Sequence, residues 1–169
     1  MGKYFVVADH HFGHHAIMEY CKRPWTNVDK MDRDLVKLHN SIVTPTDTTF
    51  FLGDVTLRGA ENIQWLRRII HSMNGRKILV FGNHDQMHYW HYLEAGFESC
   101  HTSYELDGPS FIAMAHDPCV AQDPSRLWIC GHLHNVAFSA PTHICIVSVE
   151  LTDYKPVALN DIITGWRPK

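Results

Sequence analysis

The sequence has no long apolar run, little net charge and no closely paired cysteines, and each absence excludes a class of protein. No stretch approaches the roughly 20 apolar residues that a helix needs to span a bilayer. The formal net charge of −3 provides no general basic field for nucleic acid or anionic membranes. None of the five cysteines stands in a CxxC pair, so a structural zinc ribbon is not expected.

The cysteines and the first residues also indicate a compartment. Five cysteines are an odd number without the spacing of a disulfide framework, which favours reduced thiols. A strand-like run begins at Tyr4 and leaves no room for a signal peptide before it. We therefore expect a protein of the cytoplasm that does not insert into a membrane.

The chain reads as a single domain over residues 1–169, which is long enough for a substantial core. Apolar strand-like runs alternate with helical patterns in the first half, and the second half is richer in strands. This alternation favours an α/β fold with a mixed sheet. The pattern predicts helices over 13–22, 29–43 (capped by Asn27), 61–73 and 86–95, a hairpin over 103–115 that turns at Asp107-Gly108, and a strand over 143–149.

Five short polar motifs each directly follow one of the apolar, strand-like runs. In α/β sheets, ligand sites form just beyond the carboxyl ends of the strands. The sequence therefore predicts a polar site at one edge of a sheet. The runs are 4–8, 48–52, 77–81, 111–115 and 127–130, and the motifs that follow them are Asp9-His10-His11, Gly53-Asp54, Gly82-Asn83-His84-Asp85, His116 and Gly131-His132-Leu133-His134.

The side chains in these motifs are typical metal ligands. Carboxylates, the amide oxygen of asparagine and neutral imidazoles are the donors expected for manganese, iron, nickel or zinc. One such motif is ordinary turn chemistry, but five with a metal-capable side chain at the same place are not independent turns. The set is too large for one ion and suits two ions roughly 3.5–4 Å apart that share a carboxylate. Its members are Asp9, His11, Asp54, Asn83, His116, His132 and His134.

The ordered motifs resemble the signature blocks of the calcineurin-like metallophosphoesterase superfamily. The resemblance covers roughly residues 4 to 150, and no metal position departs from the pattern. It implies an α/β fold, a four-layer α-β-β-α sandwich of two mixed β-sheets flanked by helices. Further stretches resemble a compact, cap-free bacterial and phage subgroup, namely residues 9–14, 21–24, 51–55 and 154–157.

The same resemblance assigns the ligands to two divalent ions. It implies that Asp54 bridges the ions and that a bound hydroxide attacks the phosphorus in line. Manganese is the ion we favour, and iron, nickel and zinc are also compatible with the donors. The first ion takes Asp9, His11, Asp54 and His134, and the second takes Asp54, Asn83, His116 and His132.

Residues near the ligands receive roles in catalysis or substrate binding. By resemblance, His84 contacts the phosphoryl group and protonates the leaving oxygen. Asp85 either orients the His84 imidazole or caps a helix that begins at Gln86, and both roles are compatible. His10 lies between two ligands and is expected to point away from them, because side chains alternate along extended backbone.

The weaker candidates for substrate binding are Asn83, His14, Arg58 and Arg23. A guanidinium suits bidentate recognition of a phosphate, which is the reason for considering the two arginines. The alternative for both is an ordinary exposed surface arginine. For His14, a solvated position at a helix start is equally compatible with the sequence.

The resulting hypothesis is a metal-dependent hydrolase of phosphate esters, with a small or nucleotide-type phosphodiester as the favoured substrate. The close alternative is a phosphomonoesterase or nucleotidase. A nuclease would need a basic groove, and the sequence offers only the cluster of residues 67, 68, 76 and 77. Trp65, Trp90 and Trp128 are expected in the core, not as a platform for stacking bases. A non-catalytic scaffold is the last alternative, and the intact ligand set argues against it.

Overall fold

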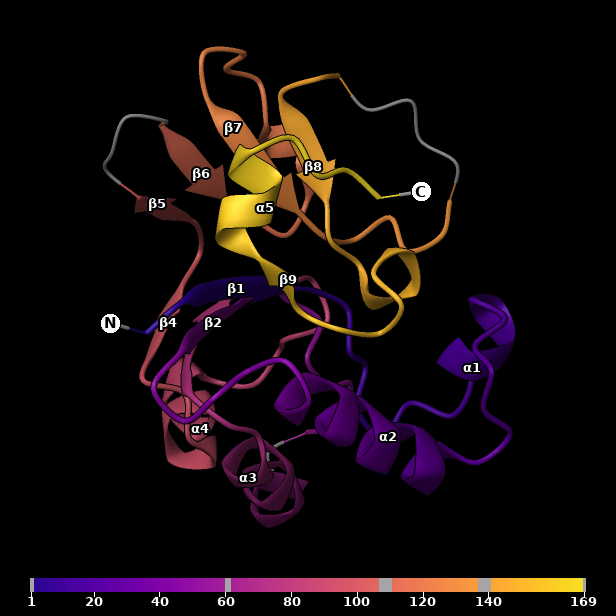
Figure 1. Ribbon diagram of the computed structural model, residues 1–169. Coiled ribbons are helices and arrows are strands. Elements are labelled where there is room, and N and C mark those ends of the chain that lie inside the picture. The colour runs from indigo at the N-terminus through magenta and orange to yellow at the C-terminus, as the bar shows by residue number, and fades with distance from the viewer. Residues whose placement is uncertain (1, 60–61, 107–110, 137–140, 169) are drawn as a thin grey trace.

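The computed structural model describes residues 2–59, 62–106, 111–136 and 141–168 and consists of two β-sheets packed face to face (Figure 1). The first sheet has the strand order β4-β3-β2-β1-β9. Its first four strands are parallel, and β9 is antiparallel to β1. The strands are β1 (Tyr4–Val7), β2 (Thr48–Phe51), β3 (Arg76–Val80), β4 (Ser99–His101) and β9 (Val157–Ala158).

The second sheet is also mixed and has the order β5-β6-β7-β8. Strands β6 to β8 are parallel, whereas β5 is antiparallel to β6 and places Tyr104 opposite Met114. This pairing confirms the predicted hairpin, whose turn at Asp107-Gly108 lies outside the described residues. The strands are β5 (Tyr104–Leu106), β6 (Ile112–Met114), β7 (Leu127–Cys130) and β8 (Ile144–Ile146).

Three helices, α2 (Val28–Asn40), α3 (Ile63–Ser72) and α4 (Tyr89–Ala95), cover the outer face of the first sheet (Figure 1). Period-2 alternation sends one set of strand side chains to this face and the other set into the space between the sheets. Each large apolar side chain buried in this way stabilises the fold by about 1.5–3 kcal/mol. The helix-facing cluster includes Val7, Phe51 and Leu79 from the strands and Leu35, Leu66 and Tyr92 from the helices.

The opposite faces of the strands form the core between the two sheets. Val6 and Phe50 of the first sheet meet Met114 and Ile129 of the second, and α5 (Leu159–Ile163) adds Leu159 and Ile162 to this cluster. On the outer face of the second sheet, Cys130, Ile144 and Ile146 pack with residues of the short 3-10 helices η2 (Pro118–Val120) and η3 (Val149–Leu151) and their ends. The predicted arrangement of two mixed sheets flanked by helices is confirmed.

The predicted helix bounds were less accurate than the strands. The α2 cap is confirmed, because the Asn27 side chain accepts a hydrogen bond from the Lys30 backbone at 2.9 Å. The helix expected over 13–22 is reduced to α1 (Ile17–Tyr20), and α4 begins at Tyr89, three residues after the expected start. Trp90 is 55% exposed, so its expected place in the core is wrong. Among the helices described, none combines the length and apolar character required to cross a membrane.

The parallel registers place the carboxyl ends of several strands at one common edge. Val7 lies opposite Phe51, and Phe51 lies opposite Leu79, so β1, β2 and β3 end together. In the second sheet, β6 and β7 are likewise parallel and in register. The two sheets are joined beside this edge, because the Ala8 amide donates to the Val147 carbonyl at 3.1 Å. The loops after five strands therefore meet in one region.

Candidate metal centre

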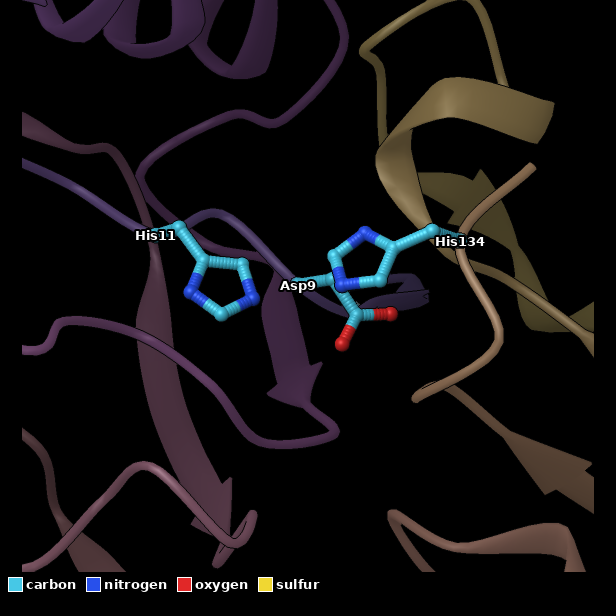
Figure 2. A group of neighbouring side chains, drawn as sticks. All are labelled: Asp9, His11 and His134. Carbon is cyan, nitrogen blue, oxygen red and sulfur yellow. The ribbon is translucent and has the colours of Figure 1, made fainter. Parts of the chain in front are cut away.

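The predicted ligands converge at this shared edge in two groups. Asp9, His11 and His134 offer ligand atoms that all lie within 4.8 Å of one another, as do Asp54, His116 and His132. Figure 2 shows the carboxylate of Asp9 and the imidazole of His11, both from the loop after β1, beside the imidazole of His134 from the loop after β7. The sequence prediction of which residues come together therefore agrees with the geometry.

Asn83 belongs to the second group. Its side-chain oxygen lies 3.1 Å from His116 Nε2 and 3.0 Å from His132 Nδ1. The two imidazole nitrogens are themselves 3.1 Å apart. Three donor atoms from three different loops thus surround one small space, as coordination of a single cation requires.

Asp54 joins the two groups. Its Oδ2 atom lies 3.5 Å from His11 Nε2 in the first group and 3.3 Å from His116 Nε2 in the second. Its Oδ1 atom accepts a hydrogen bond from the His84 backbone at 2.9 Å. The carboxylate is 1% exposed and is held between both sets of donors, which is the position of a bridging ligand.

The residues fit a pair of divalent cations. His11 is 1% exposed, and neither of its ring nitrogens has a hydrogen-bond partner in the described part of the chain. An unsatisfied buried polar group costs about 1–3 kcal/mol, and coordination to a cation removes that cost. Two carboxylates and one amide oxygen are hard donors, four imidazoles are softer ones, and this mixture suits first-row divalent metals.

The protonation preferences of the free side chains show why positive charge is needed here. Burial raises the pKa of Asp9 and lowers the pKa of His11 to about 3. Burial opposes protonation of His116, but its hydrogen bond to Asp54 and the charges of Asp9 and Asp54 raise its pKa to about 9. The buried carboxylates therefore favour positive charge in their surroundings, and a bound divalent cation would supply it.

Five of the seven predicted ligands adopt a left-handed backbone conformation. A positive φ is uncommon for residues other than glycine and costs about 1–2 kcal/mol per residue. Such strain persists where the surrounding structure holds it, and it gathers at functional sites. The five are Asp9 (φ 64°), His11 (φ 51°), Asp54 (φ 55°), His132 (φ 73°) and His134 (φ 51°).

Backbone hydrogen bonds hold these strained segments. The Asp9 amide donates to the Gly53 carbonyl at 3.0 Å, and the His11 amide donates to the Asp54 carbonyl at 2.9 Å. The His132 amide donates to the Asp9 carboxylate at 3.0 Å. The ligand loops therefore support one another.

The glycines of the motifs leave room for the ligand carboxylates. A Cβ atom on Gly82 would collide with the carboxylate and backbone of Asp54. A Cβ atom on Gly131 would lie only 2.5 Å from the Ala8 side chain and 2.9 Å from the Asp9 carboxylate. Close approach of side chain to backbone thus explains why glycine precedes Asn83 and His132.

Asp85 has a different role from either one that we predicted. It does not cap a helix, because the residue before α4 is His88. Its buried carboxylate instead accepts hydrogen bonds from the backbone amides of Asp54 at 2.7 Å, Gly82 at 2.9 Å and Val55 at 3.0 Å. Burial raises its pKa to about 7 despite these donors. Asp85 holds the loop that carries Asp54, and no hydrogen bond joins it to the His84 ring.

Arg23 also differs from both expectations, because it is neither exposed nor free to bind a substrate. Its guanidinium donates through Nε and Nη2 to Glu150, through Nη1 to the His10 carbonyl and through Nη2 to the Asp9 carbonyl. Glu150 in turn lies 3.0 Å from His134 Nδ1. Sequence analysis missed Glu150 entirely, because it stands in no motif.

His84, His14 and Arg58 remain candidates for contact with a substrate. The His84 side chain is 40% exposed, and its Nε2 atom lies 4.0 Å from Asp54 Oδ2. Together with Arg58 it lines a cavity of about 310 Å³. The His14 ring lies 5.5 Å from the ring of His11. His10 points away as predicted and stacks on Phe12.

A second cavity lies beside the group of Asn83, His116 and His132. It has a volume of about 420 Å³ and is lined by Asn83, His116 and His132 together with the aromatic rings of Phe81 and Trp128. The two cavities share no lining residue. Space for a ligand therefore lies both beside His84 and beside the second ligand group.

Comparison with known proteins gives consistent matches. The model of the calcineurin-like phosphoesterase family matches residues 2–111. The uncharacterized protein MJ1445 of Methanocaldococcus jannaschii is 31% identical over 171 residues, which cover 96% of this chain and 90% of that protein. The gene 66 protein of Mycobacterium phage L5 is 25% identical and covers 80% of this chain and 79% of its own length.

A solved structure shares the fold. The crystal structure of AQ665 from Aquifex aeolicus, a protein of unknown function, superposes with a TM-score of 0.73 at 24% sequence identity. The match covers 97% of this chain and 99% of that one. The two-sheet architecture is therefore shared over essentially the whole chain.

Proposed function

Because the chain belongs to the calcineurin-like phosphoesterase family, we propose that it is a phosphodiesterase that hydrolyses a small or nucleotide-type diester. The family assignment supports metal-dependent hydrolysis of phosphate esters as the general activity. The preference for a diester, the identity of the metal and the roles of individual residues are the specific parts of the proposal.

The chain's own residues supply two metal positions. Asp9, His11, Asp54 and His134 would hold the first ion, and Asp54, Asn83, His116 and His132 would hold the second. When bound, a pair of divalent cations lowers the pKa of coordinated water and neutralises the charge that develops on the phosphoryl oxygens. Manganese is the ion we assign, because it accepts this mixture of oxygen and nitrogen donors.

His84 donates the proton to the leaving oxygen. Its backbone amide donates a hydrogen bond to the Asp54 carboxylate, and its partly exposed imidazole lies beside the predicted ligands. An imidazole gives and takes protons near neutral pH, as this step requires. Arg58 in the same cavity provides a permanent positive charge for the leaving group or a phosphate oxygen.

The two cavities are the observation that favours a diester over a monoester. A monoester has one organic substituent on phosphorus, whereas a diester has two that need separate space. The cavity beside His84 accommodates the leaving substituent, and the cavity beside Asn83 and His132 accommodates the retained one. The aromatic rings in the second cavity suit a retained group that is itself a ring.

The basic cluster that a nuclease would use is only partly available. Arg76 forms an ion pair with Glu98, and the ammonium of the buried Lys77 donates a hydrogen bond to the Gly75 carbonyl. Arg67 and Arg68 are exposed on α3, which covers the outer face of the first sheet. This distribution favours a small substrate over a polynucleotide, and cleavage of single-stranded or duplex DNA would contradict that preference.

The test compares a diester and a monoester with the same leaving group. Metal-stripped protein is assayed with bis-p-nitrophenyl phosphate and p-nitrophenyl phosphate after addition of Mn²⁺, Ni²⁺, Zn²⁺ or Mg²⁺. We expect a metal-restored diester rate that exceeds the monoester rate and that falls by about 10²–10⁴-fold in His84→Ala. His71→Ala, which changes an exposed histidine on α3, should retain full activity.

A different result would contradict each part of the proposal. A monoester rate equal to or above the diester rate overturns the diester preference. Full activity in His84→Ala overturns the role of that residue. No hydrolysis of either ester with any of the metals overturns the phosphodiesterase assignment.

A further inference from the structure

A buried arginine–glutamate pair lies next to the metal position proposed for Asp9, His11, Asp54 and His134. The side chains of Arg23 and Glu150 are 0% and 3% exposed. Two guanidinium nitrogens, Nη2 at 2.6 Å and Nε at 2.9 Å, donate to the same Glu150 oxygen, Oε1. Removing two charges from water costs several kcal/mol per ion, so a buried pair is weak evidence for stability and calls for another explanation.

The same Glu150 oxygen also contacts a metal ligand. His134 Nδ1 lies 3.0 Å from Oε1, which fixes the tautomer with the proton on Nδ1 and leaves Nε2 as the donor toward the metal. A carboxylate that accepts this proton orients the imidazole and makes it a stronger ligand. Arg23 keeps the Glu150 carboxylate in place for that contact.

Arg23 acts on the opposite side of the same metal position. Its Nη2 donates to the Asp9 carbonyl at 2.7 Å, and its Nη1 donates to the His10 carbonyl at 2.8 Å. These carbonyls belong to the segment in which Asp9 and His11 hold positive φ angles. One guanidinium thus holds both the strained N-terminal ligands and, through Glu150, the C-terminal ligand His134.

Among the described residues, no carboxylate outside the predicted ligand set accepts a hydrogen bond from an imidazole of the second metal position. The Nδ1 atom of His116 faces a neutral acceptor, the Leu52 carbonyl, at 2.8 Å. Of its four donors only Asp54 is charged, whereas the first position has the carboxylates of both Asp9 and Asp54. Asn83 is also exposed and His132 is half-buried, whereas Asp9 is 0% exposed and His11 is 1% exposed.

We infer that Glu150, held by Arg23, is a positioning residue that makes the metal position formed by Asp9, His11, Asp54 and His134 the tighter of the two. The inference rests on the ligand sets of the proposed function, but it concerns metal affinity and not the reaction. It predicts stepwise loading, in which the supported position fills first and the position of Asn83, His116 and His132 fills second.

The experiment is calorimetric titration of metal-stripped protein with Mn²⁺. The wild-type protein should bind two ions with clearly unequal affinities. Glu150→Gln keeps the size of the side chain and an oxygen acceptor but removes the charge, and should weaken the tighter step by about 10–100-fold. The weaker step should change little. Asn83→Ala should do the reverse and weaken only the second step, which identifies each step with its position.

A matched control separates this role from a general effect of losing an ion pair. Arg76 and Glu98 form another arginine–glutamate pair, with side chains 61% and 48% exposed. Glu98→Gln should leave both Mn²⁺ affinities unchanged. Should Glu150→Gln fail to fold, Glu150→Asp keeps the charge but withdraws the carboxylate from His134, and should weaken the same step.

The outcomes distinguish this inference from the proposed function. Two equal steps in the wild-type protein, or equal weakening of both steps in Glu150→Gln, overturn the inference even when the diester is hydrolysed. Unequal steps with selective weakening of the tighter one uphold it even when no ester is hydrolysed. Absence of Mn²⁺ binding overturns the inference together with the ligand assignment on which it rests.

Discussion

Five of the predicted metal ligands occupy left-handed backbone, and this strain has a measurable consequence at the scale of a single residue. Relief of the strain at one position gains about 1–2 kcal/mol, whereas glycine loses about 0.5–1 kcal/mol more backbone entropy on folding. His132 has φ 73° and is half-buried, so His132→Gly should raise the free energy of unfolding of the metal-free protein. The increase should be about 0.5–1 kcal/mol, which is the difference between the two lower limits and between the two upper limits. Thermal denaturation of metal-stripped protein should show a midpoint about 1–4 °C higher.

The control is a strained residue without a ligand role. Lys22 is exposed and has φ 51°, so Lys22→Gly should give a similar increase in midpoint. It should retain both Mn²⁺ steps, whereas His132→Gly should lose the weaker one. A lower midpoint in both variants would mean that the left-handed conformation is not strained here.

The sequence predicted which residues converge but not how they are held. The convergence of the predicted ligands could be foreseen because each stands in a short motif after a strand and strand ends meet at one edge. Arg23, Asp85 and Glu150 were misread or missed for a common physical reason. Their partners include backbone amides and carbonyls far away in the chain, such as the Asp9 carbonyl for Arg23 and the Asp54 amide for Asp85. Every residue offers those groups, so they leave no pattern in the sequence.

At the scale of secondary-structure elements, His39 links α2 to the end of α3 and to β2. The residue is 0% exposed, its Nε2 atom lies 3.0 Å from the Asn74 carbonyl, and its ring stacks on Phe51. Burial lowers the pKa of His39 to about 4, although the hydrogen bond to Asn74 opposes the shift. The folded protein therefore keeps this imidazole neutral over a range in which the unfolded chain binds a proton.

This difference predicts how stability depends on pH. An unfolded histidine takes up its proton near pH 6.5, so between about pH 6.5 and 4 the unfolded state binds more protons than the folded state. Stability should consequently fall as the pH falls through that window, by up to about 1.4 kcal/mol per pH unit from His39. Urea denaturation at pH 7, 6 and 5 should show a smaller loss in His39→Gln, whose amide can still donate to Asn74.

His71 provides the comparison within α3. It is exposed, so His71→Gln should preserve the wild-type pH dependence. Identical losses in the wild-type protein and His39→Gln would show that His39 is not the group responsible.

The errors in predicted helix bounds also belong to this scale. Hydrophobic periodicity located the cores of α2 and α3 and the closing residue Gly96, which has φ 115°. It placed the start of α4 too early, because the Gln86 amide bonds the His84 carbonyl in a turn that presents the imidazole beside the ligands. A local pattern of apolar residues contains no information about such a turn, and so Trp90 was placed in the core although it lies exposed in the first turn of α4.

For the whole molecule, the decisive feature is that each proposed metal position draws its predicted ligands from the loops of both sheets. Asp9, His11, Asp54 and Asn83 follow strands of the first sheet, whereas His116, His132 and His134 follow strands of the second. The fold resemblance carried by the sequence predicted the two sheets. The link between them was not predicted, because the pairing of Ala8 with Val147 depends on backbone groups of residues far apart in the chain.

Bound metal should therefore stabilise the fold as a link across the sandwich. A ligand that binds only the folded state adds about 2.7 kcal/mol at a concentration 100 times its Kd. Adding Mn²⁺ at that excess to metal-stripped protein should raise the thermal midpoint by about 5–10 °C for a chain of this size. Asp54→Asn removes the charge of the bridging carboxylate and should abolish most of the shift, whereas Asp161→Asn, an exposed change on α5, should retain it.

Hydrogen exchange can locate this stabilisation within the molecule. The amides of Ala8 and Val149 form the joint between the sheets, with bonds to the Val147 and Ala8 carbonyls at 3.1 Å each. If the ions hold the sheets together, Mn²⁺ should slow exchange of these two amides more than exchange of the Met31 amide at the start of α2, whose bond to Asn27 lies within one segment. Equal slowing at all three amides would indicate general stabilisation without a link between the sheets. Selective slowing of the Ala8 and Val149 amides would show that bound metal stabilises the contact between the two sheets more than the rest of the fold.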